Sequence, residues 1–440
     1  MGTMTPPGNA PATPPGAGTT ARRTTGLAPG DPGYRRVMVA AATAGLASFN
    51  AMYLTQALLP SISDSLRVSP TTAALTVSAT TGLLAVTVVP VSIISERIGR
   101  RTVLRASVLA ATVLSLLLCL APGISSLIGL RALQGIAVAG VPAVTMTFLA
   151  EEIRPSHLGR VMGLYIAGTS IGGLMGRLIP SWFLEITDWR GAALAGASVA
   201  FLLGLVCAWA LPPQRNFTPK KITLRHEVSA FRRHWHNPRL VPLFLLPFML
   251  MGSFVSLYNY LGFQLTRQFG LSEIWAGMVF LLYLSGTWSS ARAGALSARY
   301  GPGKVLTASS AISVAGLLVM LVPALWTTVL GALMFTASFF AAHSTASALV
   351  GARADGDRAE ASSTYVMSYY LGSSILGWAL GHVFDLGWTP LVISLAGVQL
   401  VSLALTLYSD RREGRRERRQ GGRRGERRRG QKATSSAAGH

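Results

Sequence analysis

Five basic or titratable side chains stand inside long apolar stretches of the chain: Arg131, Arg177, Arg292, His343 and His382. A charged group in the middle of a membrane-spanning helix costs at least about 2.5 kcal/mol, so it usually faces protein or a water-filled cavity. No aspartate or glutamate lies in the middle of any of these stretches. A cavity with this bias in charge is expected to favour neutral or anionic small molecules over cations.

Arg131 is the strongest single candidate among them, and Gln134 follows it at a spacing of one helical turn. The arginine lies about a third of the way into its apolar stretch, and we expect it to face a cavity because a cation at that depth is costly. The alternative is an arginine whose charged end snorkels to the membrane surface.

Polar side chains also recur at helical spacing along two apolar stretches, the first and the seventh of the chain. Because polar groups in hydrocarbon are costly, these two stripes should face protein or water. They either line a substrate cavity or form hydrogen bonds between helices, and the sequence leaves both alternatives open. The residues concerned are Asn50, Tyr53 and Gln56 in the first stripe and Ser253, Ser256, Tyr258, Asn259, Tyr260 and Gln264 in the second.

A proton carrier would have to be a histidine or a carboxylate at the rim, because no acid lies at mid-depth. His382 and Asp385 are separated by one helical turn and could pair, while His343 is the other candidate. For each histidine, the alternative to proton transfer is an ordinary packing role with a satisfied hydrogen bond, and the sequence favours it at least as much.

The elements that must hold these residues are membrane-spanning helices. The chain has 440 residues, of which 50% are hydrophobic and 13% charged, against about a quarter charged in soluble proteins. A bilayer core of about 30 Å takes roughly 20 apolar residues as a helix, which satisfies its own backbone groups. The predicted spans are 37 to 60, 71 to 95, 102 to 121, 124 to 149, 160 to 184, 190 to 211, 240 to 264, 273 to 297, 303 to 323, 325 to 350, 363 to 386 and 389 to 408.

The loops between these spans predict their orientation. The even-numbered connections carry most of the loop arginines and lysines, which places both termini in the cytoplasm and the protein in the cell membrane, inner or plasma, as a multi-pass protein. We expect a disordered cytoplasmic leader at 1–36, a cytoplasmic central loop at 212–239 and a cytoplasmic tail at 409–440.

The net charge of +22 comes largely from the arginine-rich tail. This tail has no aromatic residue after Tyr408 on which bases could stack, so we expect it to attract anionic lipids and not nucleic acid. Cys119 and Cys207 both lie in apolar runs, which excludes a disulfide framework and a metal site of several cysteines. We expect a monomer with no cofactor and no metal, driven by a proton gradient.

Two internal echoes predict a repeat of a little over 200 residues. SIISERIGRR (Ser92–Arg101) follows the second span, and GALSARYGPGK (Gly294–Lys304) follows the eighth. YIAGTSIGG in the fifth span likewise aligns with YYLGSSILG in the eleventh. The chain should therefore form two pseudo-symmetric six-helix halves, 37–211 and 240–408. The glycines of the fifth span, Gly168, Gly172 and Gly176, are expected at a moving interface between the halves, with static packing as the alternative.

These motifs resemble those of the major facilitator superfamily. S-x-x-x-E-R-x-G-R-R is similar to that family's loop signature G-x-x-x-D-R-x-G-R-R, and LRALQG (Leu130–Gly135) to its fourth-span R-x-x-Q-G. The chain looks most like the bacterial inner-membrane transport proteins of the YnfM type, which are described as arabinose-efflux-permease-like. The resemblance implies twelve helices, a central cavity lined by spans 1, 4, 7 and 10, alternating access, and a role for Arg131 in proton coupling and substrate binding.

The signature loop also supplies candidates for a cytoplasmic gate. Glu96 is the acid able to latch this gate, and the second copy of the motif has Ala298 where an acid would stand. Glu151 and Arg160 could exchange ion-pair partners with Arg97 or Arg100 as the halves rock. The gating candidates are Glu96, Arg97, Gly99, Arg100, Arg101, Glu151 and Arg160 in the first half and Arg299 and Gly301 in the second.

The sequence thus predicts an all-helical secondary transporter that works by alternating access. We expect proton-coupled efflux of small neutral or anionic organic molecules or drugs. A proton symporter for uptake is the alternative within this class, and a membrane sensor or scaffold is a weaker one. An enzyme is not expected, because no nucleophile, metal cluster or pair of acids shares a common depth.

Overall fold

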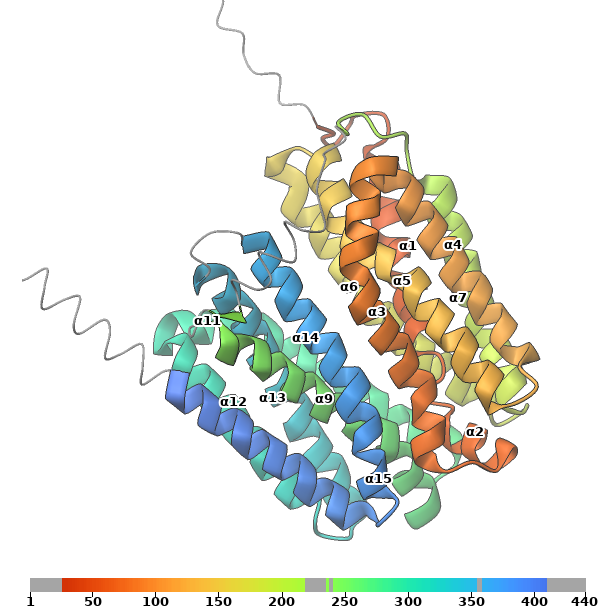
Figure 1. Cartoon of the computed structure of the whole chain (residues 1–440), viewed down its shortest axis with the longest axis vertical. Helices are drawn as coiled ribbons and strands as arrows, with labels where there is room; N and C mark the ends of the chain where they lie inside the picture. The colour runs from red at the N-terminus through yellow and green to blue at the C-terminus, as the bar shows by residue number, and fades with distance from the viewer. Residues whose placement is uncertain (1–25, 218–234, 237–239, 354–357, 410–440) are drawn as a thin grey trace, which may run out of the picture.

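The apolar runs of the chain fold as helices that stand side by side in two bundles (Figure 1). The protein is seen in a computed structural model, whose described residues are 26–217, 235–236, 240–353 and 358–409. Over these ranges there is no strand, and the only β-type pairing is a single bridge between Leu27 and Ile153.

The first bundle runs from red to yellow-green in Figure 1. Its helices are α1 (Tyr34–Tyr53), α2 (Leu59–Leu66), α3 (Pro70–Ile98), α4 (Arg100–Leu117) with the 3-10 turn η1 (Leu118–Leu120), α5 (Ile124–Glu152), α6 (Pro155–Phe183) and α7 (Trp189–Ala210).

The second bundle runs from green to blue. Its helices are α9 (Val241–Phe263) with the π-helical turn η2 (Gln264–Gln268), α10 (Glu273–Gly277), the 3-10 segment η3 (Met278–Leu282), α11 (Tyr283–Tyr300), α12 (Pro302–Val319), α13 (Leu325–Arg353), α14 (Arg358–Ala379), α15 (Gly381–Phe384) and a last helix at Trp388–Ser409.

Each predicted span coincides with one of these helical segments, so the all-helical fold of twelve spans in two pseudo-symmetric halves is confirmed. Eight of the described helices are long and apolar enough to cross a membrane by length and composition alone. The other four spans, which begin with α1, α6, α10 and α14, do not combine the required length with the required apolarity in one helix.

Three spans are broken where the sequence predicts continuous helices. The first ends at Tyr53 and passes through a turn into α2, which has Pro60 in its first turn. The eighth is divided into α10, η3 and α11, and the eleventh into α14 and α15. These breaks place Gln56 and Phe280 outside regular α-helix, beside the candidate site.

The repeat is visible in the turns and in the close packing of equivalent helices. Gly99 and Gly301 join α3 to α4 and α11 to α12 with φ of 98° and 89°, a conformation that glycine adopts without strain. A Cβ on Gly168 of α6 would lie 2.5 Å from a carbonyl of α1, and one on Gly372 of α14 would lie 2.1 Å from a carbonyl of α9.

The glycines of α6 therefore do not lie between the halves, and that prediction is wrong. Gly168, Gly172 and Gly176 all meet the backbone of α1, within the first bundle. Their missing side chains let two helices of one half approach closely, which is the static packing alternative.

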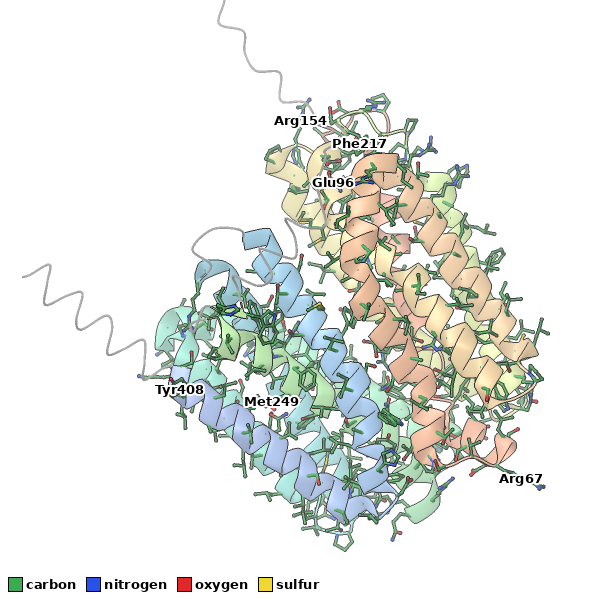
Figure 2. The ribbon with its side chains drawn as sticks, in the orientation of Figure 1. Arg67, Glu96, Arg154, Phe217, Met249 and Tyr408 are labelled. Atoms are coloured by element: carbon green, nitrogen blue, oxygen red, sulfur yellow. The ribbon has the colours of Figure 1, made fainter. Side chains whose placement is uncertain are left out.

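The two bundles meet at one end and diverge at the other (Figure 1). The end where they diverge carries Tyr34, Gly99, Gly301 and Ser409, and is called the terminal end; Glu96 and Arg154 lie there in Figure 2. The opposite end, with Arg67, α2 and α15, is called the closed end. A hydrophobic core shared by both halves includes the closed end, where Leu58, Ile62 and Tyr260 are among its buried members.

Polar contacts also join the halves toward the closed end. Thr71 donates to Asp385 at 2.8 Å, and Ser374 donates to the carbonyl of Ser78 at 2.7 Å. Arg267 pairs with Asp64 at 2.7 Å, and the backbone N–H of Ile274 reaches Glu185 at 3.3 Å.

The predicted leader is shorter than expected where the structure describes it. α1 begins at Tyr34, inside the range assigned to the leader. Leu27 pairs with the turn between α5 and α6, since its N–H donates to Glu152 and its carbonyl accepts from Arg154. Residues 26–36 are thus ordered by backbone hydrogen bonds, while 1–25 and most of the predicted central loop and tail lie outside the described residues.

Candidate functional site

Arg177 occupies the junction of the two halves near the closed end of α6. Its side chain is 2% exposed. Nε donates to Oε1 of Gln56 at 2.8 Å, and Nη1 donates to the carbonyl of Gly173 at 2.6 Å. Nε2 of Gln56 in turn donates to Oδ1 of Asn259 in α9 at 2.8 Å. Arg177, Gln56 and Asn259 therefore form one hydrogen-bonded chain from the first half to the second, which we call the junction network.

Aromatic rings surround the Arg177 guanidinium. Its carbon lies 3.8 Å from the centre of the Tyr53 ring, 4.7 Å from that of Tyr283 and 5.2 Å from that of Phe280. Ring faces attract cations, and more strongly where water is excluded. Among the described residues, no carboxylate lies within 4 Å of this guanidinium.

From this cage a row of rings leads through the second half toward the terminal end. Tyr283 lies 5.2 Å from Phe254 between ring centres, and Phe254 stacks on Phe339 at 4.0 Å. Phe339 stacks on His343 at 5.9 Å, and His343 lies 4.8 Å from Tyr369. We call these five residues the aromatic row; they come from α9, α11, α13 and α14.

A small pocket adjoins the junction network on the closed side. Its lining includes Gln56, Tyr258, Glu273, Gly277 and Phe280, and it has room for the centre of about one water molecule, roughly 10 Å³. Glu273 is the first residue of α10 and the acid that lines this pocket.

Arg131 lies elsewhere, inside the first half, and its side chain is fully buried. Nε donates to the carbonyl of Thr76 at 2.8 Å and Nη1 to that of Ala51 at 2.9 Å, with further bonds to Gln134 and the carbonyl of Met52. The expectation that it faces an open cavity is wrong in this conformation, and it does not snorkel either. Instead it satisfies carbonyls in the last turn of α1, where a cation also complements the helix dipole.

Gln134 supports Arg131 from the same helix. Its amide donates to the carbonyl of Ala111 at 2.9 Å and to the hydroxyl of Ser115 at 2.5 Å, both in α4. The pair thus ties α5 to α1, α3 and α4.

The remaining residues of the two polar stripes are divided among several environments. Asn50 is fully buried, and its amide has no hydrogen-bond partner in the described chain. Tyr258 shares a hydrogen bond with Thr336 at 2.7 Å, and Tyr260 donates to the carbonyl of Gly377 at 3.0 Å. Gln264 is half-buried at the start of η2 and does not join the junction network.

The predicted pair of His382 and Asp385 is not formed. The Asp385 carboxylate accepts from Thr71 across the halves, whereas His382 is exposed beside the Trp378 ring, 5.3 Å between centres. The two residues keep their helical spacing in α15 and its C-cap, but the carboxylate bonds across the halves and not to the histidine. His343 bonds to Tyr365 through Nδ1 at 2.9 Å, within the second half.

The gating candidates of the first half gather around a buried arginine. Arg100 is 2% exposed and bonds to Glu96 at 2.5 Å and to Glu151 at 2.7 Å. Nε of Arg101 donates to the carbonyl of Leu211 at 3.2 Å. In this conformation Glu96 therefore closes an ion-pair cluster within one half and does not reach the other.

The other gating candidates stand apart from this cluster. Arg97, Arg160 and Arg299 are exposed, and Arg299 lies over the Tyr300 ring at 5.1 Å. The asymmetry expected from Ala298 is present, because only the first copy of the motif holds a buried ion pair among the described residues.

Comparison with known proteins assigns the family. A family model described as Major Facilitator Superfamily matches residues 41–292 and 267–437. The chain belongs to the major facilitator superfamily. Its two matched stretches agree with the two helical bundles of the fold.

Curated members of the superfamily match most of the chain. The inner membrane transport protein YnfM of Escherichia coli (strain K12) is 38% identical over 377 residues, 85% of this chain and 90% of YnfM. The uncharacterized MFS-type transporter YybF of Bacillus subtilis (strain 168) is 36% identical over 382 residues, 86% of this chain and 94% of YybF.

Two further proteins match less closely. The chloramphenicol efflux pump Rv0191 of Mycobacterium tuberculosis (strain ATCC 25618 / H37Rv) is 30% identical over 216 residues, 48% of this chain and 51% of the pump. A bacterial homologue of the human lysosomal transporter Spinster, solved in an inward-facing and occupied conformation, is 15% identical with a TM-score of 0.70, covering 87% of this chain and 98% of that one. The latter likeness is one of fold.

The sequence singled out the junction network and one of the rings around it, Tyr53, but not the other two. Tyr53, Gln56, Arg177 and Asn259 were all candidates from polar groups at membrane depth. Phe280 and Tyr283 were not, because aromatic residues in an apolar run carry no signal that separates a cage from ordinary packing.

Proposed function

We propose that this superfamily member is a secondary active transporter that exports small neutral or anionic organic molecules by alternating access, in exchange for protons. The observation that carries the proposal is the arrangement of the halves, which meet at the closed end and diverge at the terminal end (Figure 1). Two bundles that touch at one end, through a shared apolar core and a few polar bonds, can rock about that contact. With both termini in the cytoplasm, this arrangement is the inward-facing state.

The proposed cargo follows from the charges near the junction. Arg177 is buried there without a carboxylate partner among the described residues, and the acids of this region lie at the rim. Such a site favours neutral and anionic molecules and repels cations.

Proton coupling is proposed to use an acid or histidine near the closed end. Glu273 is the first choice, because it shares a pocket with Gln56 of the junction network. The charged groups near it are Asp64, Glu185 and Arg267. Of the earlier candidates, Asp385 bridges the halves, and His343 and His382 are the alternative carriers in this proposal.

Export is proposed as the direction because about half of the chain is similar to a chloramphenicol efflux pump. Uptake by proton symport is the alternative. The protein is also proposed to act as a monomer, with its tail attracted to anionic lipids.

Inside-out membrane vesicles test this function. A panel of neutral, anionic and cationic compounds is offered with and without an acidic interior, and vesicles from cells that lack the protein serve as the control. We expect accumulation of neutral or anionic compounds that collapses when a protonophore is added. Accumulation only in right-side-out vesicles would establish uptake, whereas no accumulation in either orientation would favour a sensor or scaffold. Export of a cationic dye at the rate of the best neutral compound would contradict the proposed cargo.

A further inference from the structure

The Arg177 cage has the chemistry of an anion-binding site. A buried charge is costly unless it is paired, and the described residues place no acid within 4 Å of this one. The neighbouring rings and the Gln56 amide compensate in part, but none carries a negative charge. A ligand with a negative charge would complete the pairing.

The donors of Arg177 are only partly used. Nε is committed to Gln56 and Nη1 to Gly173, while the remaining N–H groups have no partner beyond the neighbouring Tyr53 side chain within the described chain. Nearby polar atoms are also unused: the hydroxyl of Tyr283 and Nδ2 of Asn259 are buried without partners. A guanidinium with free N–H groups on one edge binds a carboxylate through two parallel hydrogen bonds.

The rings define the rest of the ligand. Tyr53, Phe280 and Tyr283 flank the guanidinium on the side of the aromatic row. Tyr283, His343 and Tyr369 are only partly buried, so this row is not closed off inside the second half. Planar rings pack against such a row in stacked or edge-to-face geometry, which a saturated ring cannot reproduce.

The local charge limits the ligand to one negative group. Arg131, the other buried arginine of the first half at this level, is fully engaged by carbonyls of α1 and α3 and by Gln134. A second carboxylate would find no second free cation at the junction among the residues that the structure describes.

We propose that Arg177 anchors a binding site for a small planar aromatic monocarboxylate, whose ring packs against Tyr53, Tyr283 and the aromatic row. This proposal rests on the proposed transport function and names its substrate class. Because Arg177 also bonds to Gln56, the carboxylate competes for the group that holds the junction network together. Binding there couples the ligand to the contact between the halves.

The test is binding to the purified full-length protein in detergent, measured by calorimetry and by the ligand-induced shift in unfolding temperature. The probes are benzoate, 2-naphthoate, benzamide and cyclohexanecarboxylate. We expect the aromatic carboxylates to bind at least tenfold more tightly than benzamide or cyclohexanecarboxylate. Arg177→Gln should remove the preference for benzoate over benzamide, and Arg177→Lys should keep part of it.

Control variants separate binding from folding. Arg292→Gln changes an exposed arginine of α11 that lies over Trp288, and should leave all affinities unchanged. If Arg177→Gln does not fold, Tyr283→Leu provides the second test, since it should reduce the preference for benzoate over cyclohexanecarboxylate and leave the charge in place.

Two results would overturn the proposal. One is equal affinity of the wild-type protein for benzoate and benzamide, and the other is no binding of either aromatic carboxylate. If the vesicle panel still reveals a transported compound, only the substrate class is wrong; if no compound moves in either vesicle orientation, the transport function fails as well.

Discussion

Gln56 and Asn259 form a hydrogen bond of 2.8 Å that joins the two halves of the protein beside Arg177. Both side chains are buried, and Gln56 also accepts from Arg177, so this bond links the charged cage to the contact between the bundles. A change in the occupancy of the cage can therefore alter the balance between two conformations, which a free energy of a few kcal/mol decides.

Removing this bond should loosen the closed end. A buried hydrogen bond contributes about 0.5–1.5 kcal/mol. Gln56→Ala and Asn259→Ala should therefore each shift the conformational equilibrium roughly 2- to 10-fold. The double variant should shift it little further than either single variant, because both changes remove the same bond. The measurement is the rate of maleimide labelling of Ser181→Cys, which lies against Gly277 at the closed end, with Cys119 and Cys207 replaced. Gln399→Ala, a buried glutamine of the last helix, is the matched control and should not change the rate.

A disulfide between the halves should stop transport reversibly. A Cβ on Gly82 of α3 would lie 3.3 Å from Cβ of Ser374 in α14, close to the separation of about 3.5–4.5 Å found in disulfides. Gly82→Cys with Ser374→Cys, in a protein without Cys119 and Cys207, should crosslink under mild oxidation and lose transport until a reductant is added. Full activity of the crosslinked protein would argue against rocking of α3 relative to α14. Each single variant is the control.

Arg131→Ala should destabilise the protein more than it weakens ligand binding. The change leaves carbonyls of Thr76, Ala51 and Met52 without their donor, and each such loss costs about 1–3 kcal/mol in a buried site. We expect a lower unfolding temperature in detergent than for Arg292→Ala. An Arg131→Ala protein of normal stability that no longer binds ligand would instead assign Arg131 to the substrate site.

The ion-pair cluster at the terminal end should be stabilising, whereas the exposed Arg299 of the second half, which aligns with Arg97, should contribute little. Arg100→Gln leaves Glu96 and Glu151 unpaired around a buried position, at a cost of about 3 kcal/mol. Arg299→Gln removes an exposed charge and should change stability by less than about 0.5 kcal/mol. Thermal unfolding of the two variants checks this difference, and Glu96→Gln should likewise shift the conformational balance more than Arg299→Gln.

Glu273→Gln should uncouple transport from the proton gradient. The variant retains the shape of the side chain beside Gln56 but cannot exchange a proton. Exchange of labelled for unlabelled substrate across proteoliposomes should continue, while accumulation driven by a pH gradient should fall at least tenfold. His382→Ala, which changes an exposed titratable group in the second half, is the control. Accumulation that survives Glu273→Gln but not His382→Ala would move the proton site to the histidine.

The fold and its repeat could be read from the sequence, because membrane helices follow from the length and apolarity of each run. Gly99 and Gly301 occupy equivalent turns, and both adopt a positive φ, which glycine tolerates. The same requirement for glycine made the two turns recognisable as a repeat in the sequence. Some candidates at membrane depth are buried polar groups as expected, among them Arg131, Arg177 and Gln56, whereas Arg292 and His382 are exposed.

Only the tertiary structure decided what those groups do. Arg131 and Arg177 look alike in the sequence. Arg131 donates its hydrogen bonds to carbonyls of its own half, whereas Arg177 lies between the halves and keeps unused donors. The glycines of α6 and the breaks at Tyr53 and Ala379 depended on which helix packs against which. The sequence determines the cost of placing a polar group in a membrane. The partner that satisfies this group can lie more than a hundred positions away in the chain, as Asn259 does from Gln56, and only packing of the helices brings the two together.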